Sequence, residues 1–334
     1  MIDYRPPAAR TDYFDALYEI NLTHRIMPGL VYLYLPELRA RLQWTDEQAL
    51  WFAFLNGNTQ NPITSLTIFQ QIGPPPHTDA QIETFVEWFN GAWDTLQFDT
   101  DRRYQKKELP DSIRAYSRLT RSAGSQLTLF RNRPFRDVWD MARGQMHSFG
   151  RLGAWSYLEY VHLLGYGPQV DAMMYDDKDG SKSHRNGMLF LLGYDHLVWD
   201  KRTGSGFDGE YGDFPSLCRG LEQATDAYLT RFATDYPHTR PGRFTFESQL
   251  CQFKNGFFRR RYPGVYADMA WDRIVWAEER GNGATCSIFK DIRADCLPPW
   301  LRLETEDNPI PRAQAAAAFA DTGIPHRAEH FLPL

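Results

Sequence analysis

The sequence predicts a mainly α protein: a single large helical domain with long polar loops and at most a small β element. Capped helix starts followed by apolar segments recur along the chain. Strand-like and helix-like segments do not alternate regularly, as they would in a doubly wound sheet. No internal repeat recurs at a spacing of about 20–50 residues. With 334 residues, 43% of them hydrophobic, the chain is long enough to bury a sizeable core.

The clearest helix signals stand in the first hundred residues. Thr45-Asp46-Glu47 is a capped start for a helix that we expect to end at Asn56-Gly57. At Asn61-Pro62 a cap is followed by a proline in the first turn, and the helix that begins there must stop before Gly73 and the prolines after it. Thr78-Asp79 starts a third helix.

The rest of the chain is expected to continue in the same way. Further helices are expected at about 11–24, 111–121, 134–147, 152–164, 185–198, 212–233, 245–258, 264–280 and 311–320. The apolar, partly β-branched run at 30–35 is a candidate strand. Polar, turn-rich stretches interrupt the helices at 166–184 and 200–213. We therefore expect one domain over 1–334, with 166–184 as the place where a subdivision would fall.

Composition excludes several classes of protein. The net charge of −5 does not favour DNA binding over a wide basic surface, although a local basic patch is compatible with it. The N-terminus lacks the apolar stretch of a signal peptide, and no apolar run is long enough to cross a membrane. The four cysteines form neither a CxxC pair nor a zinc pattern. These features predict a soluble intracellular protein with reduced thiols, no structural zinc and no disulfide.

The predicted helix at 152–164 carries the first candidate for chemistry. From 154 to 164 it is apolar almost all round, which predicts burial. Arg151, Trp155, Glu159 and His162 fall on one face of it. A buried carboxylate needs a partner, and Arg151 is the nearest one in sequence. Glu159 therefore either fixes helix packing through an ion pair or is a site carboxylate whose partners tune its pKa.

A second candidate opens the predicted helix at 185–198. Lys182, His184 and Arg185 stand where a polar loop enters an apolar helix, which suits a phosphate or pyrophosphate. The P-loop pattern GxxxxGK[ST] is absent. The alternative is a solvated loop followed by an ordinary helix cap.

The predicted helix at 245–258 and the residues after it form the third candidate. The packing face of the helix consists of Phe246, Leu250, Phe253 and Phe257. Glu247 and Lys254 share another face. The run Arg259–Arg261, with Tyr262 beside it, suits a nucleic-acid backbone and base stacking. The alternative is an exposed helix end whose cations complement the helix dipole.

The fourth candidate is the polar segment 56–64 between two apolar helices. It concentrates amide and hydroxyl side chains, among them Asn56, Gln60 and Asn61. These groups either cap helices and form turns or read a base edge or an amino-acid carboxylate. The aromatic residues, which make up 15% of the chain, leave a similar choice. They either fill a helical core or line a groove in which a base stacks.

Three of these segments together resemble a phage family. They read WFAFLNGNTQNPITSLTIFQ, SFGRLGAWSYLEY and ESQLCQFKN…RRYPGVYAD, in this order along the chain. The pattern resembles the amino acid:DNA transferases, also described as α-glutamyl/putrescinyl-thymine pyrophosphorylases. The resemblance implies an enzyme that modifies phage DNA after its synthesis, in the cytoplasm of the infected bacterial host. Its substrate base is a thymine with a pyrophosphorylated 5-hydroxymethyl group, from which the amine of an amino acid displaces pyrophosphate.

This chemistry needs cations on the leaving group, a base that keeps the amine neutral, and a pocket for an unstacked base. We expect the catalytic residues to be Glu159, Lys254, Arg151 and His147. We expect the substrate-binding residues to be Asn56, Gln60, Asn61, Trp155, Lys182, His184, Arg185, Asp195, Glu247, Gln252, Arg259, Arg260, Arg261 and Tyr262. The partners implied are double-stranded phage DNA and a free amino acid. No cofactor or bound metal is expected beyond a transient Mg²⁺ that accompanies pyrophosphate.

Two other functions are compatible with the same residues. One is a helical nucleic-acid-binding protein without catalysis. The other is a hydrolase or glycosylase acting on a base, in which Glu159 or Asp195 activates water. A carboxylate and several cations lining one concave pocket would favour catalysis over binding. A second small subsite for an amino-acid carboxylate would favour a transferase over a hydrolase.

Overall fold

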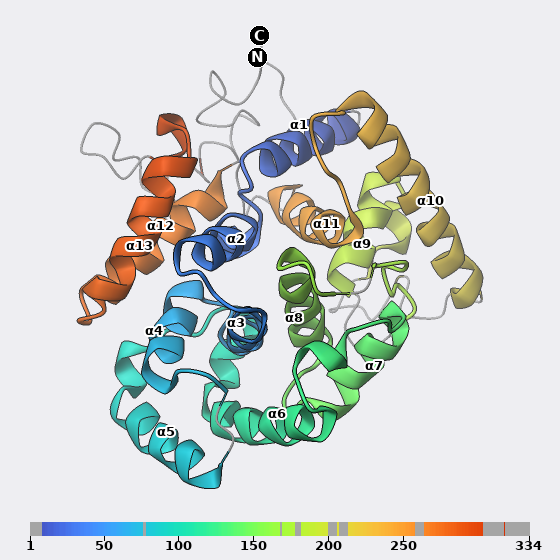
Figure 1. Cartoon of the computed structure of the whole chain (residues 1–334). Helices are drawn as coiled ribbons and strands as arrows, with labels where there is room; N and C mark the ends of the chain where they lie inside the picture. Colours follow the sequence, from blue (N-terminus) through green and yellow to red (C-terminus); the bar gives the residue numbers. More distant parts are fainter. Residues whose placement is uncertain are drawn as a thin grey trace. The chain divides into compact units, whose positions relative to one another are not determined.

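The computed structural model describes residues 9–75, 78–167, 169–177, 182–199, 206, 213–257, 264–302 and 317, without the side chains of 254–257 and 300. Within these residues the regular structure is helical and no strand forms (Figure 1). The mainly α prediction is therefore confirmed. None of the described helices is long and apolar enough to cross a bilayer.

The chain divides into two compact units. The first unit comprises Met1–Pro28, Val170–Asp268 and Pro298–Leu334, and the second comprises Gly29–Gln169 and Met269–Leu297. The chain returns to the first unit at Val170, inside the 166–184 stretch. Whether the two units act as one domain stays a prediction.

The second unit is built around α3 (Asp46–Thr59), which lies between α4 (Pro62–Ile72) and α8 (Arg151–Leu163) (Figure 1). Its other elements are α2 (Val31–Arg41), α5 (Asp79–Gly91), η3 (Trp93–Thr95), η4 (Thr100–Tyr104), η5 (Lys106–Glu108), α6 (Leu109–Ala123), η6 (Leu127–Leu129), α7 (Phe135–Gln145) and α13 (Gly283–Cys296). The helix α12 (Val265–Glu278) begins in the first unit and continues in the second.

The predicted helix starts in this unit are confirmed. Thr45 with Gln48 and Thr78 with Gln81 form reciprocal capping boxes at the starts of α3 and α5. Asn61 caps α4 by accepting from the backbone N–H groups of the second and third helical residues. Each of these caps satisfies N–H groups that have no partner within the helix.

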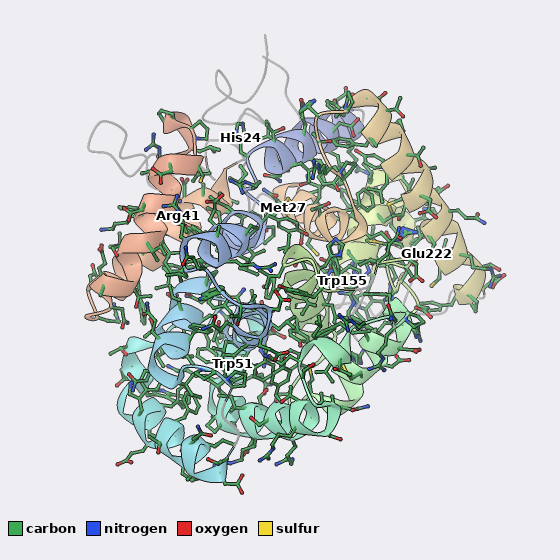
Figure 2. All side chains as sticks on the ribbon, in the orientation of Figure 1. His24, Met27, Arg41, Trp51, Trp155 and Glu222 are labelled. Atoms are coloured by element: carbon green, nitrogen blue, oxygen red, sulfur yellow. The ribbon has the colours of Figure 1, made fainter. Side chains whose placement is uncertain are left out.

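Aromatic residues fill the core of the second unit. Trp51 of α3 and Trp155 of α8 are both fully buried (Figure 2). Phe54 stacks on Tyr116 with 3.9 Å between the ring centroids. Many of the chain's aromatic side chains therefore serve packing, which is the first of the two roles considered for them.

The first unit is formed by α1 (Arg10–Thr23), α9 (Lys182–Leu191), η7 (Asp195–Leu197), α10 (Phe214–Asp235), α11 (Arg243–Phe257) and η8 (Pro299–Leu301). In Figure 1, α11 lies beside α1 and α9. The crossing of α9 and α11 is very close, because a Cβ added at Gly187 would lie 2.5 Å from the carbonyl oxygen of Leu250. Only glycine fits at this position.

Four expectations about elements were wrong. The run at 30–35 is not a strand: Leu30 ends the short helix η2 (Pro28–Leu30), and the residues after it begin α2. The run is buried on several sides, so its apolar pattern has no period of two. The helix begun at Thr45 does not end at Gly57 but continues to Thr59. The helix expected at 185–198 ends at Leu191, before Gly193 with its φ of 77°. The sequence analysis did not predict α13 at all. The helix predicted at 311–320 lies outside the described residues except for 317.

Candidate functional site

A buried polar network lies where α3 ends in the second unit. It consists of Gln60, Asn61, Asp99, Ser156, Tyr160 and Arg273. Gln60 has a left-handed backbone, with φ at 50°, and its Nε2 donates to Ser156 Oγ of α8 at 3.3 Å. The hydroxyl of Thr100 donates to Gln60 Oε1. Because Thr100 is exposed, the network reaches the surface of the unit at η4.

The turn between α3 and α4 fixes Asn61 and Asp99. The backbone N–H of Asp99 donates to the carbonyl oxygen of Thr59 at 2.8 Å. Asn61 makes a side-chain hydrogen bond to Asp99 while it also caps α4. The side chain of Asn61 therefore caps α4 and at the same time binds the carboxylate of Asp99.

Asp99 forms an ion pair with Arg273 of α12. Asp99 Oδ2 lies 2.6 Å from Arg273 Nε, and both side chains are nearly buried. Burial raises the pKa of Asp99, while Arg273 and the bond from Asn61 work in the opposite direction. Burial also raises the pKa of Tyr160, the charge of Glu159 raises it further, and a hydrogen bond with Ser156 opposes the rise. The network thus brings a carboxylate, a phenol and a guanidinium together within one unit.

Two donors of this region have no acceptor among the residues that the structure describes. They are Nη1 of Arg273 and Nδ2 of Asn56. Arg273 is 9% exposed and Asn56 is 0% exposed. The Oδ1 atom of Asn56 accepts from Ser65 Oγ at 3.1 Å, so only the amide nitrogen of that side chain is unsatisfied. A buried donor without a partner is costly, and a ligand with acceptor atoms would relieve that cost.

Glu159 is buried, with 5% of its surface exposed, and it accepts a hydrogen bond from Tyr32 Oη of α2 at 2.7 Å. Its expected burial and hydrogen bonding are confirmed. The guanidinium of Arg151 lies over the ring of Trp155, 4.9 Å from its centroid, and Trp155 also meets Trp139 edge-on. That Glu159 pairs with Arg151, and that it faces a pocket, stay predictions.

His147 lies on the surface, where its Nε2 is 3.1 Å from Glu108 Oε2. Ligand atoms of Glu108, Asp111 and His147 lie within 4.8 Å of one another, the one such grouping found in the described part of the chain. Arg114 already pairs with Asp111 at 2.7 Å, and Lys107 lies 3.7 Å from Glu108. That the protein holds no metal beyond a transient Mg²⁺ stays a prediction.

In the first unit, the crossing of α9 and α11 brings the second and third candidates together. His184 is fully buried, with its Nδ1 atom 3.6 Å from Glu247 Oε1 and its ring stacked on Tyr175. Arg185 is also fully buried and donates to the carbonyl oxygen of Tyr175 at 2.7 Å. These contacts organise the interior of the unit, and phosphate binding by His184 and Arg185 stays a prediction.

The other sequence-predicted residues of the first unit are placed as follows. Gln252 accepts from Asn21 Nδ2 at 2.6 Å, inside a buried amide cluster. Asp195 binds both terminal nitrogens of Arg10, at 2.6 and 2.9 Å. The ammonium of Lys182 lies over the ring of Trp199. The side chain of Lys254 and all of Arg259, Arg260, Arg261 and Tyr262 lie outside the described residues.

Sequence reasoning missed Tyr32, Asp99 and Arg273. Each has a partner that is distant in sequence, and Tyr32 and Glu159 are 127 positions apart. No local pattern could have joined these residues. Ser156 and Tyr160 could have been found, because they lie one turn apart on α8.

The chain matches the family model of the amino acid:DNA transferases over residues 32–262. It belongs to this family. It is 31% identical over 301 residues to a serinyltransferase of Salmonella phage ViI, with 84% of this chain and 71% of the relative aligned. No solved structure matches it.

Membership of the amino acid:DNA transferases makes this chain an enzyme with an amino acid and DNA as its substrates. It thereby sets aside the nucleic-acid-binding protein without catalysis and the base-acting hydrolase. The matched segment contains every residue of the buried polar network except Arg273.

Proposed function

We propose that this transferase joins the amine of a free amino acid to a thymine base of phage DNA inside the infected host. The reacting carbon is the 5-methylene group of a 5-hydroxymethyl-uracil whose oxygen carries pyrophosphate. Family membership supports the transfer of an amino acid to DNA. The relative from Salmonella phage ViI is named a serinyltransferase, so serine is the first amino acid to test.

The observation that carries the proposal for the site is the pair of unsatisfied donors on Arg273 and Asn56. Asp99 holds Nε of Arg273, which leaves Nη1 to meet an acceptor. A guanidinium binds carboxylates with charge-assisted hydrogen bonds. We therefore assign Arg273 to the carboxylate of the incoming amino acid, and Asn56 to an oxygen of the same amino acid or of the base.

In this scheme Glu159 is the general base. It removes a proton from the ammonium group of the amino acid, and the neutral amine attacks the methylene carbon. A C–N bond forms while the C–O bond to pyrophosphate breaks, and pyrophosphate leaves with the electron pair. The proton left on the new secondary amine passes to solvent. Tyr32, which donates to Glu159, orients the carboxylate.

The test uses DNA that contains pyrophosphorylated 5-hydroxymethyl-uracil. The enzyme is incubated with this DNA and one amino acid at a time, and the nucleosides are analysed by mass spectrometry. We expect a new nucleoside whose mass exceeds that of the 5-hydroxymethyl nucleoside by the mass of the amino acid minus one water, with serine tested first. A product carrying only the hydroxymethyl group would show hydrolysis and contradict the proposal.

Two variants test the assigned residues. Glu159→Gln should lower kcat by about 10²–10⁴-fold, the range for loss of a general base. Glu87→Gln, at an exposed position of α5, is the control and should leave kcat unchanged. Arg273→Lys should raise KM for the amino acid and leave KM for DNA unchanged. Equal increases in both KM values would show that Arg273 does not bind the amino acid.

A further inference from the structure

The stretch 102–145 of the second unit is strongly basic in an acidic chain. It holds eleven Lys and Arg residues against four Asp and Glu residues, while the whole chain has 37 against 42. The rest of the chain is therefore more acidic than its total charge indicates. Such a concentration of one sign of charge creates a local field that attracts polyanions.

Several of these cations are already engaged. Arg114 pairs with Glu83 and Asp111, and Arg136 lies 3.6 Å from Asp140. Arg102 is buried and serves the interior. These residues do not supply a binding surface.

Other cations of the stretch are exposed. Arg118 of α6 and Arg131, which follows η6, are exposed and make no ion pair with any residue that the structure describes. Arg103 of η4 is exposed too, and its guanidinium lies over the ring of Tyr104, 4.8 Å from the centroid. Tyr104 is 69% exposed. We call Arg103, Tyr104, Arg118 and Arg131 the basic face.

The elements that carry these residues belong to one unit and touch in chain order, since η4 contacts η5, η5 contacts α6, and α6 contacts η6. On α6 the side chains of Ile113, Tyr116 and Thr120 are buried. Arg114 and Arg118, one turn apart, lie on another side of the helix. The amphipathic pattern of α6 therefore turns Arg118 to solvent.

Arg102 fixes η4 to the neighbourhood of the buried polar network. Its Nε donates to the carbonyl oxygen of Asn58 at 3.0 Å, and its Nη1 donates to that of Ser148 at 2.7 Å. Two residues earlier, Thr100 donates to Gln60 of the network. The exposed part of η4 is thus tied to the buried polar network.

We propose that the basic face is a DNA-binding surface of this enzyme, with Arg103, Arg118 and Arg131 on phosphates and Tyr104 stacked on an unpaired base. This proposal rests on the proposed function, because DNA must reach the network. Phosphate contacts by cations position a nucleic acid without reading its sequence. An exposed aromatic ring beside an arginine suits a base that has left the helix stack. Enzymes that carry out chemistry on a base commonly take it out of the stack in this way.

The test measures binding of unmodified double-stranded DNA by fluorescence anisotropy between about 50 and 200 mM salt. Arg118→Ala and Arg131→Ala should each weaken binding across all sequences, and each should lower the slope of log K against log salt by about one. Arg280→Ala, at an exposed arginine of the same unit, is the matched control and should change neither quantity. Circular dichroism checks that the variants fold.

A second comparison tests the stacking role. Tyr104→Ala should weaken binding to a duplex with one mismatched base about tenfold or more, and should weaken binding to the intact duplex much less. Equal losses on both duplexes would remove the stacking role. The basic face would be overturned by two results together. A triple Arg259/Arg260/Arg261→Ala variant would lose the whole salt dependence of DNA binding, and Arg118→Ala and Arg131→Ala would each leave that dependence unchanged.

Because these measurements use unmodified DNA, they need no transfer reaction. If the enzyme forms no amino-acid product but Arg118→Ala and Arg131→Ala lower the salt slope, the proposed function fails and the basic face stands. If product forms and neither variant changes the slope, the basic face fails alone.

Discussion

Asp99 shows how a single buried residue depends on its partners. Its carboxylate loses hydration on folding, which raises its pKa. Arg273 and Asn61 offset only part of that rise in pKa. A folded-state pKa above the unfolded value means that the native state favours the protonated acid. The stability contributed by this preference is complete below the unfolded pKa and is lost as the pH rises through the folded pKa.

We therefore predict that Arg273→Ala destabilises the protein in a pH-dependent way. The variant leaves the Asp99 carboxylate buried without its cation, which should lower the free energy of unfolding by about 3–5 kcal/mol near neutral pH. The pKa of Asp99 should rise further, so the loss relative to the parent should grow between about pH 4 and pH 7. Urea unfolding at several pH values measures this. A loss that is the same at every pH would show that Asp99 is not the group responsible.

The buried carboxylate of the site was partly predictable from sequence. Glu159 interrupts a segment that is apolar on every side, so its burial followed from the chain itself. Its partner Tyr32 could not be predicted from the sequence. The apolar face of a helix shows that a residue packs, but it does not show which distant helix the residue packs against. The same holds for Arg273, whose position on α12 carries no local sign that Asp99 faces it.

At the level of whole elements, most predicted helices start and end close to the observed bounds, and the larger errors fall on particular elements. A start is marked by a side chain that bonds to its own helix, as Thr45 and Thr78 do. Neither α2 nor α13 has a side-chain cap bond at its start, and the first was taken for a strand while the second was missed. Gly57 suggested an end but lies inside α3, where its missing side chain lets α8 approach.

We predict that Gly57→Ala destabilises the protein although alanine is the better helix former. An added Cβ would lie 3.1 Å from Cβ of Tyr157 and 3.2 Å from Cε1 of Phe149. Crowding of this kind lowers the free energy of unfolding by about 1–3 kcal/mol. The higher helix propensity of alanine raises it by only about 0.5–1 kcal/mol. Gly144→Ala in α7 is the control, because beyond the chain neighbours and the backbone of its own helix no described atom lies within 4 Å of the added Cβ. It should be neutral or stabilising in urea unfolding, and equal effects of the two substitutions would contradict the packing role of Gly57.

For the molecule as a whole, the total charge hides how charge is distributed along the chain. A net charge of −5 conceals a stretch of eleven cations and four acids. The run of three consecutive arginines at 259–261 is apparent in the sequence itself, whereas the cations of α6 are spaced along the helix. Spaced residues such as Arg114 and Arg118 share a side only once the helix is recognised.

The fold as a whole should not depend on disulfide bonds. None of the four cysteines forms a disulfide in the structure. Cys286 and Cys296 both lie on α13, ten residues apart, which in a helix corresponds to about 15 Å. A disulfide requires Cα atoms within about 4.4–6.8 Å. Burial raises the pKa of Cys286 to about 11, so little of the reactive thiolate forms there at neutral pH.

We predict that the free energy of unfolding is the same with and without a reductant, because a native disulfide would add about 2–5 kcal/mol that reduction removes. Under native conditions iodoacetamide should label the half-buried Cys251 and Cys296 before the buried Cys218 and Cys286. Urea unfolding in paired buffers and peptide mass spectrometry over time measure the two effects. A midpoint that falls on reduction, or early labelling of Cys286, would mean that the thiols of the folded protein are not placed as described. Full labelling of all four cysteines in urea provides the reference.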